Sequence, residues 1–214
     1  LLPVGQLIPA IMPILETRLF DDGCQIFLWE IAESEPFYLE AMDWTSWGLE
    51  ALSGAHPFRR RDFLSSRHLM HLATGLTGDD VTKSEEGPWL IKGGGFLSIS
   101  HSGQWTGLAV SSQPVGFDLQ QHSDKLRTIA PRFLDPAERE ALGGIDCEDL
   151  SDLCLAWAAK EAVYKANAQR GLAFARQIRL EIELGEGEFM IPSASVYANH
   201  RVRHFNIKHD KKED

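Results

Sequence analysis

WAAKEAVYK, residues 157–165, is the stretch around which this chain is organised, and it predicts one helical segment. Trp157, Glu161 and Lys165 are spaced four apart and share one helix face, which Leu150 and Cys154 extend upstream. The apolar members indicate that this face is turned to the core, where an acid or a base without a partner is costly. Two interpretations stay open: an ordinary Glu–Lys pair on a solvated face, or a carboxylate and an ammonium that line a site.

The composition predicts a globular protein that does not bind nucleic acid in general. The chain has 214 residues, 43% of them hydrophobic, and a formal net charge of -10, whereas general nucleic-acid binding requires a basic surface. Cys24, Cys147 and Cys154 are odd in number and show no CxxC spacing, which favours a reducing, cytoplasmic location. Residues 1–15 are apolar but broken by prolines and lack a basic leader, so we expect an extended arm and no membrane span.

The pattern of elements predicts an α+β fold. Helical patterns cover residues 35–52, 59–74, 126–133, 136–142 and 149–168, and strand patterns cover 24–31, 96–101, 105–110, 115–119, 178–184, 188–191, 196–197 and 202–207. Each half of the chain therefore holds helices and a sheet. We expect two similar-sized lobes, residues 1–112 and 113–214, with a seam near Ser111–Pro114.

Two strand patterns carry polar residues that need an explanation. In QPVGFDLQ, residues 113–120, Asp118 lies among apolar neighbours, where an unpartnered acid is unlikely, and Gly116 permits close backbone approach. In FLSISH, residues 96–101, Ser98 and Ser100 point to one face, and His101 ends the other, apolar face. Two roles for His101 stay open: a structural histidine with its hydrogen bonds satisfied, or a catalytic histidine.

Arg59-Arg60-Arg61 opens the second predicted helix. Cations at a helix N-terminus are disfavoured by the helix dipole, so either a phosphate holds them there or they form a solvated basic cluster.

Three motifs together carry a family resemblance. SISHSG at 98–103, QPVGFDLQ at 113–120 and WAAKEAVYKA at 157–166 resemble, in order and approximate spacing, the phosphopantetheinyl transferases of the larger, single-chain type, over roughly residues 56–182. The resemblance implies two α+β lobes related by pseudo-twofold symmetry, with coenzyme A in the cleft between them. It also implies transfer of 4'-phosphopantetheine from coenzyme A to a serine of an apo acyl or peptidyl carrier protein, with Mg²⁺ required and 3',5'-ADP released.

The resemblance implies a metal site and catalytic residues. Asp118 and Glu161 are implied to ligate Mg²⁺, and their hard oxygens suit this ion. Glu161 is also implied to accept the serine proton, and Lys165 to assist the departing phosphate. Many members carry a second acid two residues after the strand Asp; here it is Gln120, a weaker, neutral ligand, so water is expected to complete the shell.

The resemblance also implies coenzyme A contacts. Arg67 matches a basic position in the first-lobe helix, and Arg59 and Arg60 are placed to bind the 3'-phosphate. Contacts with the coenzyme A phosphates are implied for His101 and Lys160, and a coenzyme A contact is implied for Ser100. His101 is counted among the catalytic residues as well.

The expected partners are coenzyme A and a carrier protein, with the chain acting as a monomer. Carrier proteins are usually acidic, so docking is expected to use a local basic or apolar patch, for which the candidates are Arg127, Arg132 and Arg139. Two other functions stay open: a non-catalytic relative that binds coenzyme A or a carrier protein, and a metal-dependent hydrolase of a nucleotide pyrophosphate.

Overall fold

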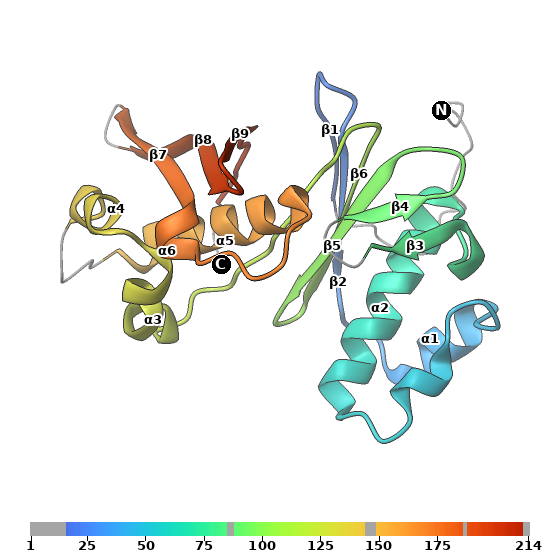
Figure 1. Ribbon diagram of the computed structural model, residues 1–214. Helices are drawn as coiled ribbons and strands as arrows, with labels where there is room; N and C mark the ends of the chain where they lie inside the picture. The colour runs from blue at the N-terminus through green and yellow to red at the C-terminus, as the bar shows by residue number, and fades with distance from the viewer. Residues whose placement is uncertain (1–15, 85–87, 144–148, 186–187, 212–214) are drawn as a thin grey trace.

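The computed structural model describes residues 16–84, 88–143, 149–185 and 188–211, which form two groups of elements (Figure 1). The arm predicted for residues 1–15 lies outside these ranges. Within them, no helix has the length and apolar character needed to cross a membrane.

The first group is an antiparallel sheet with helices packed against one face. Its strand order is β1-β2-β6-β5-β4-β3, and its strands are β1 (Glu16–Leu19), β2 (Gln25–Glu30), β3 (Val81–Lys83), β4 (Trp89–Ile91), β5 (Phe96–Ser102) and β6 (Trp105–Ser111). Helix α2 (Pro57–Thr74) packs on β5 and β6, and α1 (Glu35–Ala41) packs on α2. As predicted, α2 ends at Gly75, whose φ of 71° is left-handed. Two short 3-10 turns, Leu49–Leu52 and Gly78–Asp80, complete this group.

The second group is built around helix α5 (Leu150–Asn167), which packs on a three-stranded antiparallel sheet. The sheet order is β7-β8-β9, with β7 (Ile178–Gly185), β8 (Glu188–Ala198) and β9 (Arg201–Asn206). Helix α3 (Lys125–Phe133) packs on α5, α4 (Pro136–Ala141) packs on β7, and α6 (Phe174–Gln177) packs on α3, β7 and β8. Asp135 and Glu138 form the predicted capping box at the start of α4.

Each group has its own hydrophobic core. One core contains Trp29, Leu97 and Leu108, with buried residues drawn from 27–108. The other contains Leu153 and Ile191, with buried residues drawn from 126–196. The α+β class is therefore confirmed, and the two cores support, as a proposal, the division into lobes 1–112 and 113–214. The sheets differ in size, and the pseudo-twofold relation stays a prediction.

Residues 114–121 join the lobes, and we call them the seam segment. The strand predicted at 115–119 is wrong, because this stretch is extended but belongs to no sheet. The seam segment crosses the face of the sheet that bears the serines of β5. Phe117 packs there directly on the neighbouring strand β6, where a Cβ added to Gly107 would lie 2.5 Å from Cε1 of Phe117. Side-chain hydroxyls of β5 replace the carbonyls of a neighbouring strand. The three bonds run from the backbone N–H groups of Phe117, Leu119 and Gln121 to the Oγ atoms of Ser98, Ser100 and Ser102, at 3.0, 3.2 and 2.9 Å.

Other differences from the predicted elements are local. The helix predicted over 35–52 ends at Ala41 and resumes only as the 3-10 turn from Leu49. The two strand patterns at 188–191 and 196–197 form the single strand β8, because Pro192 lies within it without ending it. The short strands β3 and β4 were not predicted, since three residues give too little periodicity.

Candidate active site

Asp118 is held at the seam by two donors that reach the same carboxylate oxygen. The hydroxyl of Ser100 donates to Oδ1 of Asp118 at 2.7 Å, and Nζ of Lys165 donates to the same oxygen at 2.7 Å. The Asp118 side chain is 9% exposed. The partner predicted for this acid therefore exists, and it is a hydroxyl–ammonium pair supplied by β5 and α5.

Lys165 uses its remaining donors on backbone carbonyls. Nζ lies 2.9 Å from the carbonyl oxygen of Phe117 and 3.4 Å from that of Ile99. An ammonium has three N–H donors, so these bonds together with Asp118 account for all of them. Lys165 therefore ties α5 to both the seam segment and β5.

Glu161 lies one helical turn before Lys165, on the side of α5 that faces the seam. Burial raises the pKa of Glu161, the nearby Asp118 carboxylate raises it further, and Lys165 lowers it. Gly116 makes this proximity possible, since a Cβ there would lie 1.8 Å from the carbonyl oxygen of Ala162. The close approach predicted for Gly116 is thus an approach to the backbone of α5.

The donor set at the seam fits a divalent cation that also binds a substrate phosphate. The described residues include no group of three His, Cys, Asp or Glu side chains that could hold a metal alone. Asp118 and Glu161 offer two nearby carboxylates, of which Asp118 is paired with the Lys165 ammonium, and this donor set suits Mg²⁺ completed by phosphate oxygens and water. Gln120 turns its amide Nε2 to the carbonyl oxygen of Gln121 at 2.6 Å, and its place as a ligand stays a proposal.

The phosphate contact predicted for Lys160 is wrong. Its side chain is fully buried among core residues of the second lobe. Nζ lies 2.6 Å from Oε2 of Glu138, 2.6 Å from the carbonyl oxygen of Ile178 and 3.3 Å from that of Phe174. Lys160 therefore supports the fold, and Glu138 is its partner; the capping-box pattern indicated Glu138 for a helix start but gave no signal for this pairing.

His101 lies apart from the carboxylates. Successive residues of β5 point to opposite faces, so Ser100 faces the seam and His101 faces α2. Nδ1 of His101 is 3.4 Å from Oδ2 of Asp62, and the imidazole is half exposed. Arg61 lies beside them: its Nη2 donates to the carbonyl oxygen of Gly103 at 2.7 Å and to Oδ1 of Asp62 at 3.2 Å. The sequence interpretation missed Arg61 and Asp62, although Arg61 belongs to the basic cluster that it singled out.

The other predicted coenzyme A contacts on α2 have different surroundings. Arg60 forms an ion pair with Glu35 and donates to the carbonyl oxygen of Leu52 at 2.9 Å, so it joins α2 to α1. Arg59 is exposed. Arg67 lies over the rings of Phe63 and Trp89, at 4.1 and 5.1 Å from their centroids. Burial lowers the pKa of Arg67 to about 10.

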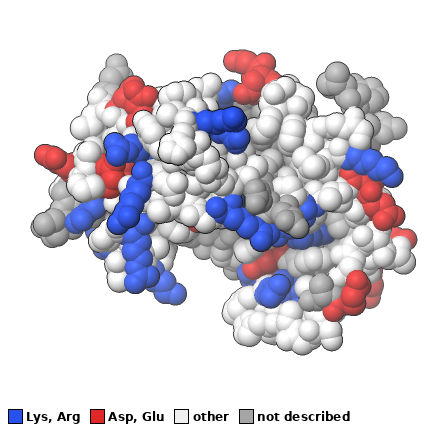
Figure 2. All heavy atoms as spheres, in the orientation of Figure 1, with Lys and Arg blue, Asp and Glu red and all other residues white. Residues whose placement is uncertain are grey.

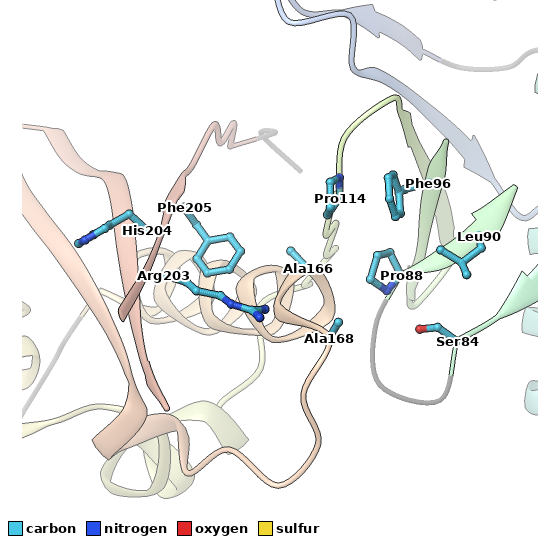
Figure 3. A pocket seen from close by; sticks show the side chains of 10 residues that line it. All are labelled: Ser84, Pro88, Leu90, Phe96, Pro114, Ala166, Ala168, Arg203, His204 and Phe205. Atoms are coloured by element: carbon cyan, nitrogen blue, oxygen red, sulfur yellow. The ribbon is translucent and has the colours of Figure 1, made fainter. Parts of the chain in front are cut away.

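A cavity of about 500 Å³ opens between the lobes near the C-terminal end of α5 (Figure 3). One wall comes from the first lobe and the other from the second, with Pro114 of the seam segment between them. The lining is mostly apolar; its main members are Pro88, Phe96, Ala166, Arg203 and Phe205.

Basic side chains gather over α3 and α6, on the left of the view in Figure 2. These two helices carry Lys125, Arg127, Arg132 and Arg176, all of them exposed. Arg127 lies 3.7 Å from Asp124. This chain of net charge -10 therefore has a local basic surface, which we call the α3–α6 patch.

Comparison with known proteins relates the seam and α5 to one family. Residues 114–213 match the model of the 4'-phosphopantetheinyl transferase superfamily. The chain is 31% identical over 141 residues to the 4'-phosphopantetheinyl transferase Npt of Nocardia iowensis, which covers 61% of this chain and 63% of that protein. It is 35% identical over 78 residues to a 4'-phosphopantetheinyl transferase of Bacillus subtilis, covering 36% of this chain and 34% of that protein. The chain thus spans less than two thirds of the length of either relative.

The matched region contains Asp118, Glu161 and Lys165 together. Over residues 114–213, the chain is therefore similar to the 4'-phosphopantetheinyl transferase superfamily.

Proposed function

We propose that this protein transfers the 4'-phosphopantetheine arm of coenzyme A to a serine of an apo acyl or peptidyl carrier protein, with Mg²⁺, and releases 3',5'-ADP. We place it with the larger, single-chain type of the family, acting as a cytoplasmic monomer. The observation that supports this best is the convergence of Asp118 and Glu161 on one seam, within the region that matches the superfamily.

The proposed reaction is a phosphoryl transfer supported by positioning and charge. The serine oxygen of the carrier attacks the phosphorus that bears pantetheine, and the bond from this phosphorus to the bridging oxygen breaks. That oxygen leaves with 3',5'-ADP. Glu161 accepts the serine proton, directly or through water. Asp118 and Glu161 would hold the Mg²⁺, which when bound neutralises charge on the pyrophosphate.

Lys165 contributes its charge beside Asp118 in this proposal. All its donors are used within the protein. Assistance to the departing phosphate, as the resemblance implies, therefore requires Lys165 to release one of these bonds.

Coenzyme A is proposed to lie along the seam between the lobes. At the end of β5, the guanidinium of Arg61 and the imidazole of His101 are the groups proposed to contact a phosphate, and the exposed Arg59 lies on the same helix as Arg61. We propose Arg61 rather than Arg60 for this role, because Arg61, although also paired with Asp62, contacts Gly103 beside the end of β5, whereas Arg60 is paired with Glu35 of α1.

The α3–α6 patch is the proposed docking surface for the carrier protein. A basic surface on an acidic chain attracts an acidic partner to one face, and the association should weaken as salt screens the charges.

Mass spectrometry of an apo carrier protein incubated with this protein, coenzyme A and Mg²⁺ tests the function. A mass gain of one phosphopantetheine, lost with EDTA, is expected. Asp118→Ala and Glu161→Ala should each abolish the gain without unfolding the chain, and near-normal transfer by either variant would contradict the metal-site assignment.

The same experiment separates the two other functions. Mg²⁺ binding without transfer to any carrier would favour the non-catalytic relative. Release of phosphopantetheine into water with no carrier present would favour the pyrophosphate hydrolase.

A further inference from the structure

We propose that Ser100 is a positioning residue for the Asp118 carboxylate: together with Lys165 it holds Oδ1 and leaves Oδ2 available to a divalent cation. This inference rests on the proposed function only in taking Asp118 as a metal ligand. The resemblance instead implied that Ser100 contacts coenzyme A.

The bonds of Ser100 favour positioning over ligand binding. Its side chain is 6% exposed. Its hydroxyl donates its single proton to Oδ1 of Asp118 at 2.7 Å and accepts the backbone N–H of Leu119 at 3.2 Å. A hydroxyl has only one proton to donate, so Ser100 has none left for a phosphate oxygen.

The two donors on Asp118 come from opposite sides of the seam. Ser100 reaches it from β5 of the first lobe, and Lys165 reaches it from α5 of the second, both at 2.7 Å and both on Oδ1. Among the described residues, no side chain or backbone donor bonds to Oδ2. Fixing one oxygen of a carboxylate restricts rotation of the group, so the other oxygen is presented in one direction.

Ser98 provides a matched control within the same strand. It lies two residues before Ser100 on the same face, is 3% exposed, and accepts the N–H of Phe117 at 3.0 Å. Ser98 therefore holds the seam segment in the same way as Ser100 but does not bond to a carboxylate. Any effect of Ser100→Ala beyond that of Ser98→Ala isolates the bond to Asp118.

The test measures Mn²⁺ affinity by electron paramagnetic resonance on the full chain, with Mn²⁺ as the spectroscopic probe for Mg²⁺. We expect Ser100→Ala to weaken Mn²⁺ binding about tenfold, in the range found when partners of metal ligands are removed. Ser98→Ala should change the affinity less than about threefold, because it removes one hydrogen bond to the seam segment but neither donor on Asp118. Thermal unfolding of both variants checks that they lose similar stability.

Equal loss of affinity in the two variants, or an unchanged affinity in Ser100→Ala, would overturn the proposal, as would a wild-type chain that binds no Mn²⁺.

If Ser100→Ala fails to fold, Ser100→Cys replaces it, because cysteine keeps the volume but is only a weak donor. Ser100→Cys should show the same selective loss of Mn²⁺ affinity, and an unchanged affinity would overturn the proposal. A wild-type chain that binds Mn²⁺ but modifies no carrier contradicts the proposed function alone. Transfer activity with unaltered Mn²⁺ affinity in Ser100→Ala contradicts the inference alone.

Discussion

Replacing Lys160 with methionine tests whether this buried ammonium supports the fold or binds a phosphate. The change keeps the length and apolar stem of the side chain but removes the charge. It leaves Glu138 buried at 4% exposure without its counter-ion, and leaves the carbonyl oxygens of Ile178 and Phe174 without this donor. Removing one member of a buried ion pair costs about 3–5 kcal/mol. We therefore expect Lys160→Met to lose that amount of unfolding free energy.

Urea unfolding followed by circular dichroism measures this loss. With a denaturant slope of about 2 kcal/mol per M, the midpoint should fall by about 2 M. Glu138→Gln removes the matching charge and keeps an oxygen for the N–H of Leu180, which Glu138 accepts at 2.8 Å. The double variant should therefore be more stable than Lys160→Met alone.

Calorimetry of coenzyme A binding tests the alternative, that Lys160 binds a phosphate. Under conditions where Lys160→Met remains folded, its affinity for coenzyme A should match that of the wild type. Unchanged stability with at least a tenfold weaker affinity would refute the structural role and restore the phosphate contact implied by the family resemblance.

Three further perturbations follow from single contacts. Gly116→Ala places a methyl group 1.8 Å from the carbonyl oxygen of Ala162. The substitution should lower the free energy of unfolding by about 1–3 kcal/mol and reduce transfer. An unchanged melting temperature with full transfer would contradict the close approach. Arg61→Ala should weaken coenzyme A binding, while Arg60→Ala should mainly lower stability. Calorimetry measures the affinity and thermal unfolding the stability, and the opposite pattern of losses would contradict these assignments. Burial lowers the pKa of His68, so below about pH 6.5 the unfolded chain takes up a proton that the folded chain does not. The free energy of unfolding should therefore fall by about 1.4 kcal/mol for each pH unit below that value. His68→Phe should flatten this pH dependence, as measured by urea unfolding at about pH 5–7.

Features set by neighbouring residues could be predicted from the sequence. The helix over 149–168 appears as α5, the capping box of Asp135 and Glu138 forms, and Gly75 ends α2. Each depends on side chains a few positions apart on one element, where spacing fixes geometry.

Features that depend on which side of a helix meets a neighbour could not be predicted. Lys160 and Glu161 are adjacent, and so are Arg60 and Arg61, yet a step of about 100° along a helix separates their directions. α5 packs on two sides, against its own sheet and against the seam, so its apolar pattern does not distinguish the core side from the site side. Lys160 consequently lies in the core, whereas Glu161 lies at the seam.

The seam segment shows why the region that matches the superfamily does not contain the whole candidate site. Asp118, Glu161 and Lys165 all lie within residues 114–213, but the seam segment has no sheet partner of its own. Its backbone is held by the hydroxyls of β5, which belongs to the first lobe. Because those bonds set the direction of Asp118, the geometry of the carboxylate pair depends on residues of the first lobe, outside the matched region. A substitution on β5 can therefore alter the site without touching any of its charged groups.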